Sequence, residues 1–245
     1  MRIVSWNIRA GGGRRVEQIA DQLRRWSPDI VALSEFRATP PSRWLGEALA
    51  GLGLSHQRTT ADATWPASNR LLVASCWPLR RIAIGNAPQL DRWLLVSVAA
   101  PRRFTLGAMH VPNRVTGRKY PYLDAVLTLA RRWRGGPALL VGDTNCGRIG
   151  IDEESPAINK REDRWIASLV MAGWSDAFRD VHVDERVYSW YSPNAGHGFR
   201  LDQAFVNRAL RSELMDARYE WGRAERNDRR AALSDHAALI VELRR

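Results

Sequence analysis

The sequence predicts an α/β protein in which two packed, mostly antiparallel sheets are flanked by helices. Short apolar runs alternate with helical patterns along the chain, which is typical of sheets covered by helices. Three strand patterns follow one another with no helix between them, which indicates antiparallel pairing. Strands and helices recur in two similar halves, which predicts two packed sheets with helices on their outer faces.

The first half begins with an apolar run at residues 2–6, which predicts a strand. A helical pattern follows until Ser27-Pro28 ends it, and a buried strand is expected at residues 30–33. The other elements expected in this half are a helix around Trp44 and Leu49 and strands at 71–75, 94–98 and 104–109.

The second half begins with a helix through Leu123 and Ala130, which Gly135-Gly136-Pro137 ends. An apolar strand at residues 138–141 and a helix around Trp165 come next. Further strands are expected at 188–191, 201–206, 219–221 and 237–243.

The composition favours one domain that covers residues 1–245. With 45% apolar residues, the chain can bury a large core and needs neither a disulfide nor a metal to fold. Cys76 and Cys146 lie in dissimilar contexts, so a reducing compartment is expected. We find neither a leader nor an apolar run of the length that a membrane span needs, about 18 residues, and therefore predict a cytoplasmic protein. The oligomeric state stays open.

The formal net charge is +11, and nearly all of the basic residues are arginine. Clustered guanidinium groups attract phosphate backbones and release their counterions. This charge favours a nucleic-acid partner, although a genomic base composition rich in arginine codons would produce the same bias.

Asp143 and Asn145 follow the apolar strand at 138–141. Because their spacing is two, we expect both side chains on the same face at the mouth of the strand. A carboxylate can activate water or hold a metal, and an amide can donate to a phosphate oxygen. An Asx turn at the end of a strand is the alternative.

Ser234-Asp235-His236 precedes the last strand. A histidine beside carboxylates can act as a base or hold a phosphoryl group, because a carboxylate fixes its tautomer and supports its cationic form. Asp202 begins an apolar strand, where acids are uncommon. The simpler interpretations are a surface turn for the tripeptide and an ion pair with Arg200 for Asp202.

Glu35 follows the strand at 30–33, and Asn7 ends the first strand. Mg²⁺ prefers about two protein carboxylates together with water and substrate oxygens. We therefore expect Glu35 to supply one hard oxygen ligand in a cleft, whereas in isolation it would be read as a solvated loop residue.

Together these residues resemble the endonuclease/exonuclease/phosphatase superfamily over nearly the whole chain. The matching motifs, in order, are Trp6-Asn7, Leu33-Ser34-Glu35, Gly142-Asp143-Thr144-Asn145, Arg200-Leu201-Asp202 and Ser234-Asp235-His236. The resemblance implies a four-layer α/β sandwich with its site at one edge of the paired sheets. It also implies hydrolysis of phosphodiesters or phosphomonoesters with Mg²⁺ or Mn²⁺.

Carried over by position, the resemblance gives each residue a role. Glu35 would be the principal metal ligand, with Asn7 and Asp235 near the metal. The remaining roles are activation or orientation of water by Asp143, phosphate contact by Asn145 and orientation of His236 by Asp202. Whether His236 removes a proton from water or stabilises the phosphorane stays open at this level.

The middle of the chain is similar to the exonuclease III-type branch, notably around residues 149–154 and 173–179. His110 is a departure, since that branch usually has a tyrosine there, and it is closer to the DNase I and sphingomyelinase pattern. We therefore predict that His110 is a general acid on the leaving oxygen, with a buried structural histidine as the alternative. The glutamate that DNase I-like members place on the preceding strand is missing from Ser68-Asn69-Arg70-Leu71.

Substrate contacts are expected from aromatic and basic residues near the site. Trp190 could stack on a base or wedge into a groove, with Trp65 as a second candidate. Arg114, followed by Arg118 and Lys119, could contact the phosphate backbone or could be solvated loop cations.

Three functions remain to be compared. A nuclease acting on DNA or RNA is favoured by the charge, the exonuclease III-like middle and Trp190. A phosphatase or a phospholipid phosphodiesterase of sphingomyelinase type is favoured by His110 and by the short segment between Trp190 and Asp202. A binding module without catalysis is opposed by the complete set of polar residues.

Overall fold

Alternation of side chains divides the apolar residues of each central strand between two faces. In β1 (Arg2–Asn7), Ile3 belongs to one buried cluster and Val4 to another. The same alternation runs through β8 (Ala138–Asp143). Because both strands contribute to the Ile3 cluster, that cluster fills the space between two sheets, while the other faces pack against helices.

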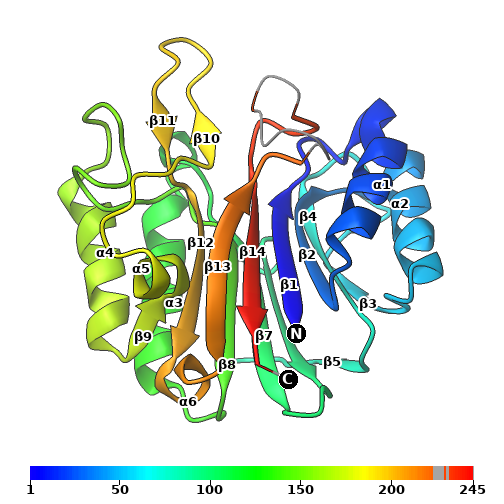
Figure 1. Cartoon of the computed structure of the whole chain (residues 1–245), viewed down its shortest axis with the longest axis horizontal. Coiled ribbons are helices and arrows are strands. Elements are labelled where there is room, and N and C mark those ends of the chain that lie inside the picture. The colour runs from blue at the N-terminus through cyan, green and yellow to red at the C-terminus, as the bar shows by residue number, and fades with distance from the viewer. Residues whose placement is uncertain (223–228, 230–231, 245) are drawn as a thin grey trace.

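The computed structural model describes residues 1–222, 229 and 232–244, and it contains two six-stranded sheets and a short hairpin (Figure 1). In spatial order, sheet A is β13 (Leu214–Glu220), β14 (Ala238–Leu243), β1, β2 (Ile30–Phe36), β4 (Arg70–Ser75) and β3 (His56–Thr59). Sheet B is β5 (Leu79–Arg81), β6 (Trp93–Val98), β7 (Phe104–His110), β8, β12 (Asp202–Asn207) and β9 (Trp174–Asp176). The hairpin is β10 (Trp190–Tyr191) with β11 (Gly198–Phe199).

Helices cover the outer faces of both sheets. Sheet A is covered by α1 (Val16–Trp26) and α2 (Pro40–Gly51), and sheet B by α3 (Lys119–Arg132) and α4 (Lys160–Met171). The shorter helices are α5 (Ala177–Val181), α6 (Arg208–Arg211) and the 3₁₀ turns η1 (Gly13–Arg15) and η2 (Arg114–Thr116). This arrangement confirms the predicted four-layer sandwich.

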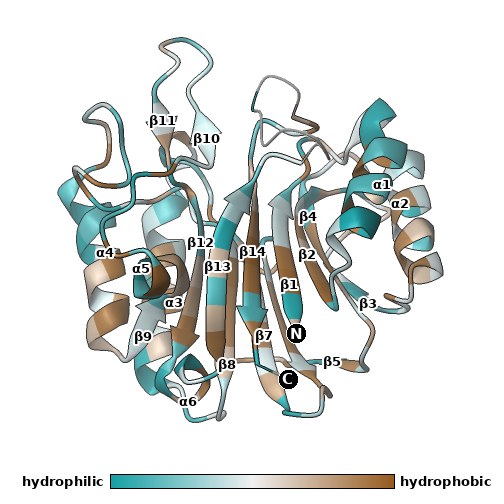
Figure 2. Cartoon of the chain, in the orientation of Figure 1, coloured by the Kyte–Doolittle hydropathy of each residue, from teal (hydrophilic) through white to brown (hydrophobic). Residues whose placement is uncertain are grey.

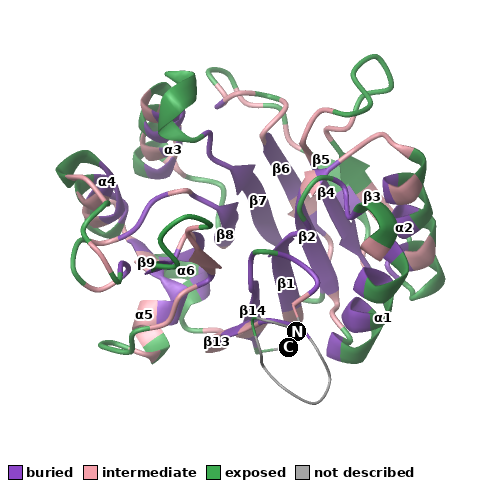
Figure 3. Ribbon diagram, turned by 90° about the horizontal axis from the view of Figure 1, so that it is seen from above, coloured by how far each residue is buried: buried purple, intermediate pink, exposed green. Residues whose placement is uncertain are grey.

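The apolar residues gather on the strands and on the inner faces of the helices (Figure 2). Seen from the end that carries the loops, the buried strands lie in the middle and the exposed helix surfaces lie outside (Figure 3). No helix within the described part of the chain is both long and apolar enough to cross a membrane.

The strands that the sequence did not reveal are short and lie at the sheet edges. β3 reads His-Gln-Arg-Thr and has no buried residue, because an edge strand is covered on fewer sides. β5 and β9 each span three residues. β13 begins at Leu214, earlier than residues 219–221, because its outward residues are polar and conceal the pattern.

Strand direction brings one set of strand ends to a single edge of the sandwich. β1 runs parallel to β2, and β7 runs parallel to β8. β12 is antiparallel to β8, with Asp202 opposite Asp143, and β14 is antiparallel to β1. The ends of four strands and the beginnings of two therefore meet at this edge. Since β1 and β14 pair across nearly the whole chain length, the topology supports our proposal of a single domain.

Candidate active site

Strand periodicity extends the layer between the sheets into a polar cluster at this edge. In β8, Leu139 and Val141 lie between the sheets, so Asp143 continues the same face. Three further buried residues also continue the inner face of their strands by alternation, namely Asn7 in β1, His110 in β7 and Asp202 in β12. The apolar patterns that build the core thus also aim these polar side chains at one point.

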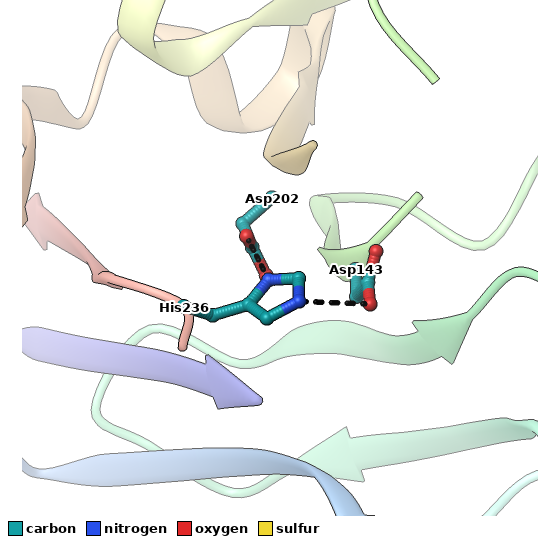
Figure 4. Close-up of side chains that lie close together, drawn as sticks. All are labelled: Asp143, Asp202 and His236. Atoms are coloured by element: carbon teal, nitrogen blue, oxygen red, sulfur yellow. Dashed lines mark hydrogen bonds and ion pairs between the residues drawn. The ribbon is translucent and has the colours of Figure 1, made fainter. Parts of the chain in front are cut away.

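His236 lies between two carboxylates, as Figure 4 shows. Its Nδ1 is 2.8 Å from Oδ2 of Asp202, and its Nε2 is 3.9 Å from Oδ2 of Asp143. All three side chains are buried. Asp202 therefore holds the ring, while the opposite nitrogen faces Asp143.

Neighbouring groups fix both members of the His236–Asp202 pair. The Ser189 hydroxyl donates to Oδ2 of Asp202 at 2.7 Å. The indole of Trp6 donates to the carbonyl of His236 at 2.9 Å. Arg200 does not pair with Asp202 but with carboxylates elsewhere, so the simpler interpretation of Asp202 as its ion-pair partner is wrong.

The carboxylates change the protonation of His236. Burial alone lowers the pKa of His236, but the charges of Asp202 and Asp143 outweigh burial and raise this pKa from 6.5 to about 10. Burial also raises the pKa of Asp143, and His236 partly offsets this effect. At neutral pH the ring is cationic, and Asp143 is a stronger base than an exposed aspartate.

His110 lies on the other side of Asp143 in a different environment. Its Nε2 is 3.6 Å from Oδ2 of Asp143, and its Nδ1 is 3.1 Å from Nη1 of Arg92. Burial, together with the positive charges of Arg92 and His236, lowers the pKa of His110 to about 4 despite Asp143. This histidine is therefore neutral at pH 7, which is not the state expected of a general acid.

Two amides surround Asp143. The Asn7 side chain donates to Oδ2 of Asp143 at 3.0 Å, and the backbone N–H of Asn145 donates to Oδ1 at 3.0 Å. The second bond is the Asx turn considered above, and it coexists with the cluster. Asn145 lies outside the strand at φ 48°, and its side chain donates to the carbonyl of Val111.

Glu35 owes its position to a β-bulge. Ser34 pairs with Leu71 and Phe36 with Arg70, so Glu35 is an extra residue in β2, with φ 60°. A bulge re-aims a side chain that strand alternation would direct elsewhere. Such a left-handed conformation costs on the order of 1–3 kcal/mol and is typical of functional sites.

Oxygen atoms suited to a hard divalent cation lie at this edge. Oε2 of Glu35 accepts the N–H of Ala10 at 2.6 Å, which leaves the other carboxylate oxygen for a ligand. Asp235 is exposed, 3.9 Å from Nε of Arg9. Carboxylate and amide oxygens suit Mg²⁺ or Mn²⁺. The site cluster, which we define as Asp143, Asp202 and His236, could also hold a metal ion, since it offers ligand atoms within 4.8 Å of one another.

Comparisons with known proteins agree with this geometry. The model of the Endonuclease/Exonuclease/phosphatase family matches residues 4–236. The chain belongs to this family. An exodeoxyribonuclease of Streptococcus pneumoniae is 22% identical over 99% of both chains. The DNA repair nuclease APEX1 of Danio rerio is 22% identical over 89% of this chain and 76% of its own length. The structure of the 3′ phosphatase NExo from Neisseria bound to product DNA hairpin has a TM-score of 0.79 at 22% identity, covering 99% of both chains.

Membership of the Endonuclease/Exonuclease/phosphatase family confirms the family predicted from the motifs. It also confirms the prediction of an enzyme that hydrolyses phosphate esters, and it opposes a binding module without catalysis. The roles of individual residues stay predictions.

The predicted substrate contacts lie in different surroundings. The ring of Trp190 is half-buried, 6.3 Å from the ring of His236. Arg114 donates to both oxygens of Glu162 at 2.7 Å, so much of its hydrogen-bonding capacity is used within the protein itself. Lys119 is buried, and its ammonium group donates to Glu162 and to the carbonyl of Asn145. The expectation that Lys119 contacts nucleic acid is therefore wrong.

Sequence analysis did not assign roles to Ser189 and Arg92, which contact the predicted residues directly. Ser189 precedes Trp190, and Arg92 precedes β6. Ser189 lies in the stretch 188–191 that resembles the exonuclease III-type branch, but the resemblance gave it no role, and Arg92 lies in no motif. Only the contacts between distant segments reveal what these two residues do. The missing glutamate partner of His110 was the one signal that another group must contact its Nδ1.

Proposed function

We propose that this protein is a divalent-metal-dependent nuclease that cleaves phosphodiester bonds of DNA. The observation that carries the proposal is a cationic His236, held by Asp202 and facing Asp143, at the edge where Glu35 and Asn7 offer hard oxygens. The nuclease names of the two relatives support DNA over RNA. A cytoplasmic location remains our prediction.

The side chains of the site divide the work of hydrolysis. His236, cationic at neutral pH, donates from Nε2 and stabilises the negative charge that develops on the phosphorane oxygens. Asp143 orients the attacking water and accepts its proton, for which its raised pKa suits it. This division favours phosphorane stabilisation over base catalysis by His236, the alternative that the sequence left open.

The divalent cation would be held by Glu35, with Asn7 and Asp235 close by. Because Nδ1 of His236 is committed to Asp202 and its ring is cationic, we assign the metal to the oxygen side of the site rather than to the site cluster. When bound, Mg²⁺ or Mn²⁺ supplies positive charge that polarises a phosphoryl oxygen. Asn145 is the proposed phosphate contact.

Nucleic acid fits the surroundings of the site. The net charge of +11 favours a polyanion. Trp190 lies beside the phosphate position proposed above, and its ring is 6.0 Å from that of Phe199. An aromatic face there can stack on an unpaired base. Arg114 could contribute only through the part of its guanidinium that Glu162 leaves available.

A second candidate is the removal of a phosphate from the 3′ end of DNA. The fold similarity to a 3′ phosphatase is compatible with it, and the same cation and histidine would bind a terminal phosphate. The phospholipid phosphodiesterase suggested by His110 loses support, because the neutral state of His110 differs from the general acid on which that comparison rested.

Three substrates distinguish these candidates. A labelled duplex with 3′-hydroxyl ends, the same duplex with 3′-phosphate ends and sphingomyelin vesicles would each be incubated with Mg²⁺ or with EDTA. We expect Mg²⁺-dependent shortening of the duplex that weakens steeply with salt. Release of phosphate alone would favour the second candidate, and hydrolysis of the lipid alone would contradict both.

A further inference from the structure

His110 contacts a cation at the position where an acidic partner would be expected. Arg92 immediately precedes β6, and His110 ends β7, so pairing of these two strands sets the two residues side by side. The His110 N–H donates to the Arg92 carbonyl at 3.0 Å, and the Tyr122 hydroxyl donates to the same carbonyl at 2.7 Å. The main chain of Arg92 is therefore held firmly beside the ring.

The chemistry of a guanidinium group fixes the tautomer of that ring. Arginine has only hydrogen-bond donors, so at 3.1 Å from Nη1 the Nδ1 atom of His110 must accept. A neutral imidazole has one N–H, which must then be on Nε2. Protonation of Nδ1 would set two donors against each other, so this contact also opposes the cationic ring.

The neighbouring charges explain why no acid takes this place. Asp91 is next to Arg92 in sequence but forms an ion pair with Arg70. Arg70 belongs to the stretch where a glutamate partner was missing from the sequence. Arg70 thus binds the carboxylate that is adjacent to Arg92 in sequence, and Arg92 contacts the histidine.

The other nitrogen of the ring faces the reaction site. Nε2 of His110 is 3.6 Å from Oδ2 of Asp143, which is too long for a hydrogen bond. The N–H of Nε2 is therefore available to an oxygen atom that approaches it from the open side of the site. His236 approaches the same Asp143 oxygen at 3.9 Å, so two N–H donors and one carboxylate surround this position.

We propose that Arg92 is a positioning residue that holds His110 as a neutral Nε2–H donor. His110 then hydrogen-bonds a phosphate oxygen and keeps its own proton, instead of transferring it to the leaving oxygen as a general acid. This inference rests on the proposed function for the identity of the oxygen, but the tautomer itself does not depend on a substrate. The low pKa of His110 agrees with it.

The test is ¹⁵N NMR of histidine-labelled protein at neutral pH, without metal or substrate. The chain has five histidines, and the signals of His110 are those lost in His110→Asn. We expect an unprotonated Nδ1 and a protonated Nε2 for His110. A proton on Nδ1 in the wild type would overturn the proposal.

Two variants of similar size sharpen the test. Arg92→Lys keeps a group that can only donate and should keep the pattern, whereas Arg92→Glu offers an acceptor and should place a proton on Nδ1. An unchanged pattern in Arg92→Glu would overturn the proposal. Circular dichroism melting checks that each variant is folded. If Arg92→Glu does not fold, the protonation of His110 in the wild type and in Arg92→Lys decides.

Kinetics connect the tautomer to turnover. Arg92→Glu should lower kcat on DNA by about 10-fold or more, while KM changes little, and Arg92→Lys, which keeps a donor, should lower kcat much less. A purely structural role would lower kcat equally in both variants. If the wild type does not cleave DNA at all, the proposed function fails, while the NMR result on Arg92 still stands.

Discussion

Two of the buried groups of charged side chains in the described part of the chain can be compared, and only one of these two has the features of a catalytic site. The arginine cluster, which we define as Arg179, Arg200, Asp152 and Asp176, is centred on Arg200, two residues before Asp202. Arg200 is fully buried and donates to both carboxylates, to Asp152 at 2.8 and 2.9 Å and to Asp176 at 2.6 and 3.2 Å. Arg179 binds Asp152 as well. Two cations thus face two anions.

In the site cluster of Asp143, Asp202 and His236, the opposite charges are balanced less completely. Two carboxylates face one imidazolium, and Asp143 has no hydrogen bond to either histidine ring. The pKa of Asp152 is lowered because Arg200 and Arg179 outweigh its burial, whereas the pKa of Asp143 is raised. Buried charge alone therefore does not mark a site. A functional site is marked instead by a buried charge that lacks a complete set of partners and lies next to groups with shifted pKa values.

The largest expected effect comes from breaking the arginine cluster. Arg200→Met would leave Asp152 and Asp176 buried without their main partner, which should lower the free energy of unfolding by about 3–5 kcal/mol. Urea unfolding measures it. Arg24→Met is the matched control, because Arg24 pairs with Asp21 at the surface, and surface pairs contribute about 1 kcal/mol or less. Equal losses in the two variants would contradict the comparison.

A substitution in the site cluster should mainly lower the turnover rate. His236→Asn is expected to reduce kcat by about 10²-fold or more, because the donor to the developing negative charge is lost. His182→Asn serves as the control, since His182 pairs with Glu185 at the surface. Cleavage of labelled DNA measures both, with circular dichroism to confirm folding. Similar activity in the two variants would remove His236 from the mechanism.

The site residues were easier to predict than the groups that hold them. Asp143 and Asn7 follow apolar runs, and period-two alternation places them where the structure does. Glu35 depends on a bulge that no local pattern indicates, and Arg92 reaches His110 only through the pairing of β6 with β7. Lys119 looked like a surface cation, yet burial against Glu162 depends on the distant helix α4.

The strands, too, were predicted where the local sequence determines them and missed where distant contacts do. Central strands were predicted because both of their faces are buried and their apolar runs are unambiguous. Edge strands such as β3 and β5 have few buried residues, so their sequences resemble loops. Three consecutive strand patterns predicted antiparallel neighbours, which is confirmed for β6 with β7. It is wrong for β4, which pairs with β2 and β3 in the other sheet, because pairing depends on contacts between distant segments.

The contributions of the two clusters to the stability of the protein should be lost at opposite ends of the pH range. The pKa of His236 is raised from 6.5 to about 10, so its contribution is fully present below pH 6.5 and is lost as pH rises through about 10. The pKa of Asp152 is lowered from 3.8, so its contribution is present above that value and is lost as pH falls below it.

Urea unfolding across this range checks the difference. The stability gap between wild type and His236→Asn should narrow in alkali, and the gap between wild type and Asp152→Asn should narrow in acid. If both stability differences narrowed at the same end of the pH range, the proposed difference in charge pairing between the two clusters would be wrong.

A smaller effect is expected at the rim of the site cluster. Trp190→Ala should weaken binding of single-stranded DNA by about 1–3 kcal/mol through the loss of stacking on a base. Trp44→Ala is the control, since Trp44 is exposed on α2. Fluorescence anisotropy of labelled DNA in EDTA measures binding without cleavage. An equal loss in both variants would assign the effect to general surface changes.

The most direct test of the account compares DNA cleavage by the wild type and by Asp143→Asn, with Mg²⁺ and after its removal by EDTA. Asp143→Asn keeps the shape of the side chain but removes the carboxylate that both histidines face. We predict rapid cleavage by the wild type with Mg²⁺, none with EDTA, and a loss of about 10²-fold or more in Asp143→Asn. Cleavage at the wild-type rate by Asp143→Asn, or cleavage unaffected by EDTA, would contradict a metal-dependent site built around this carboxylate.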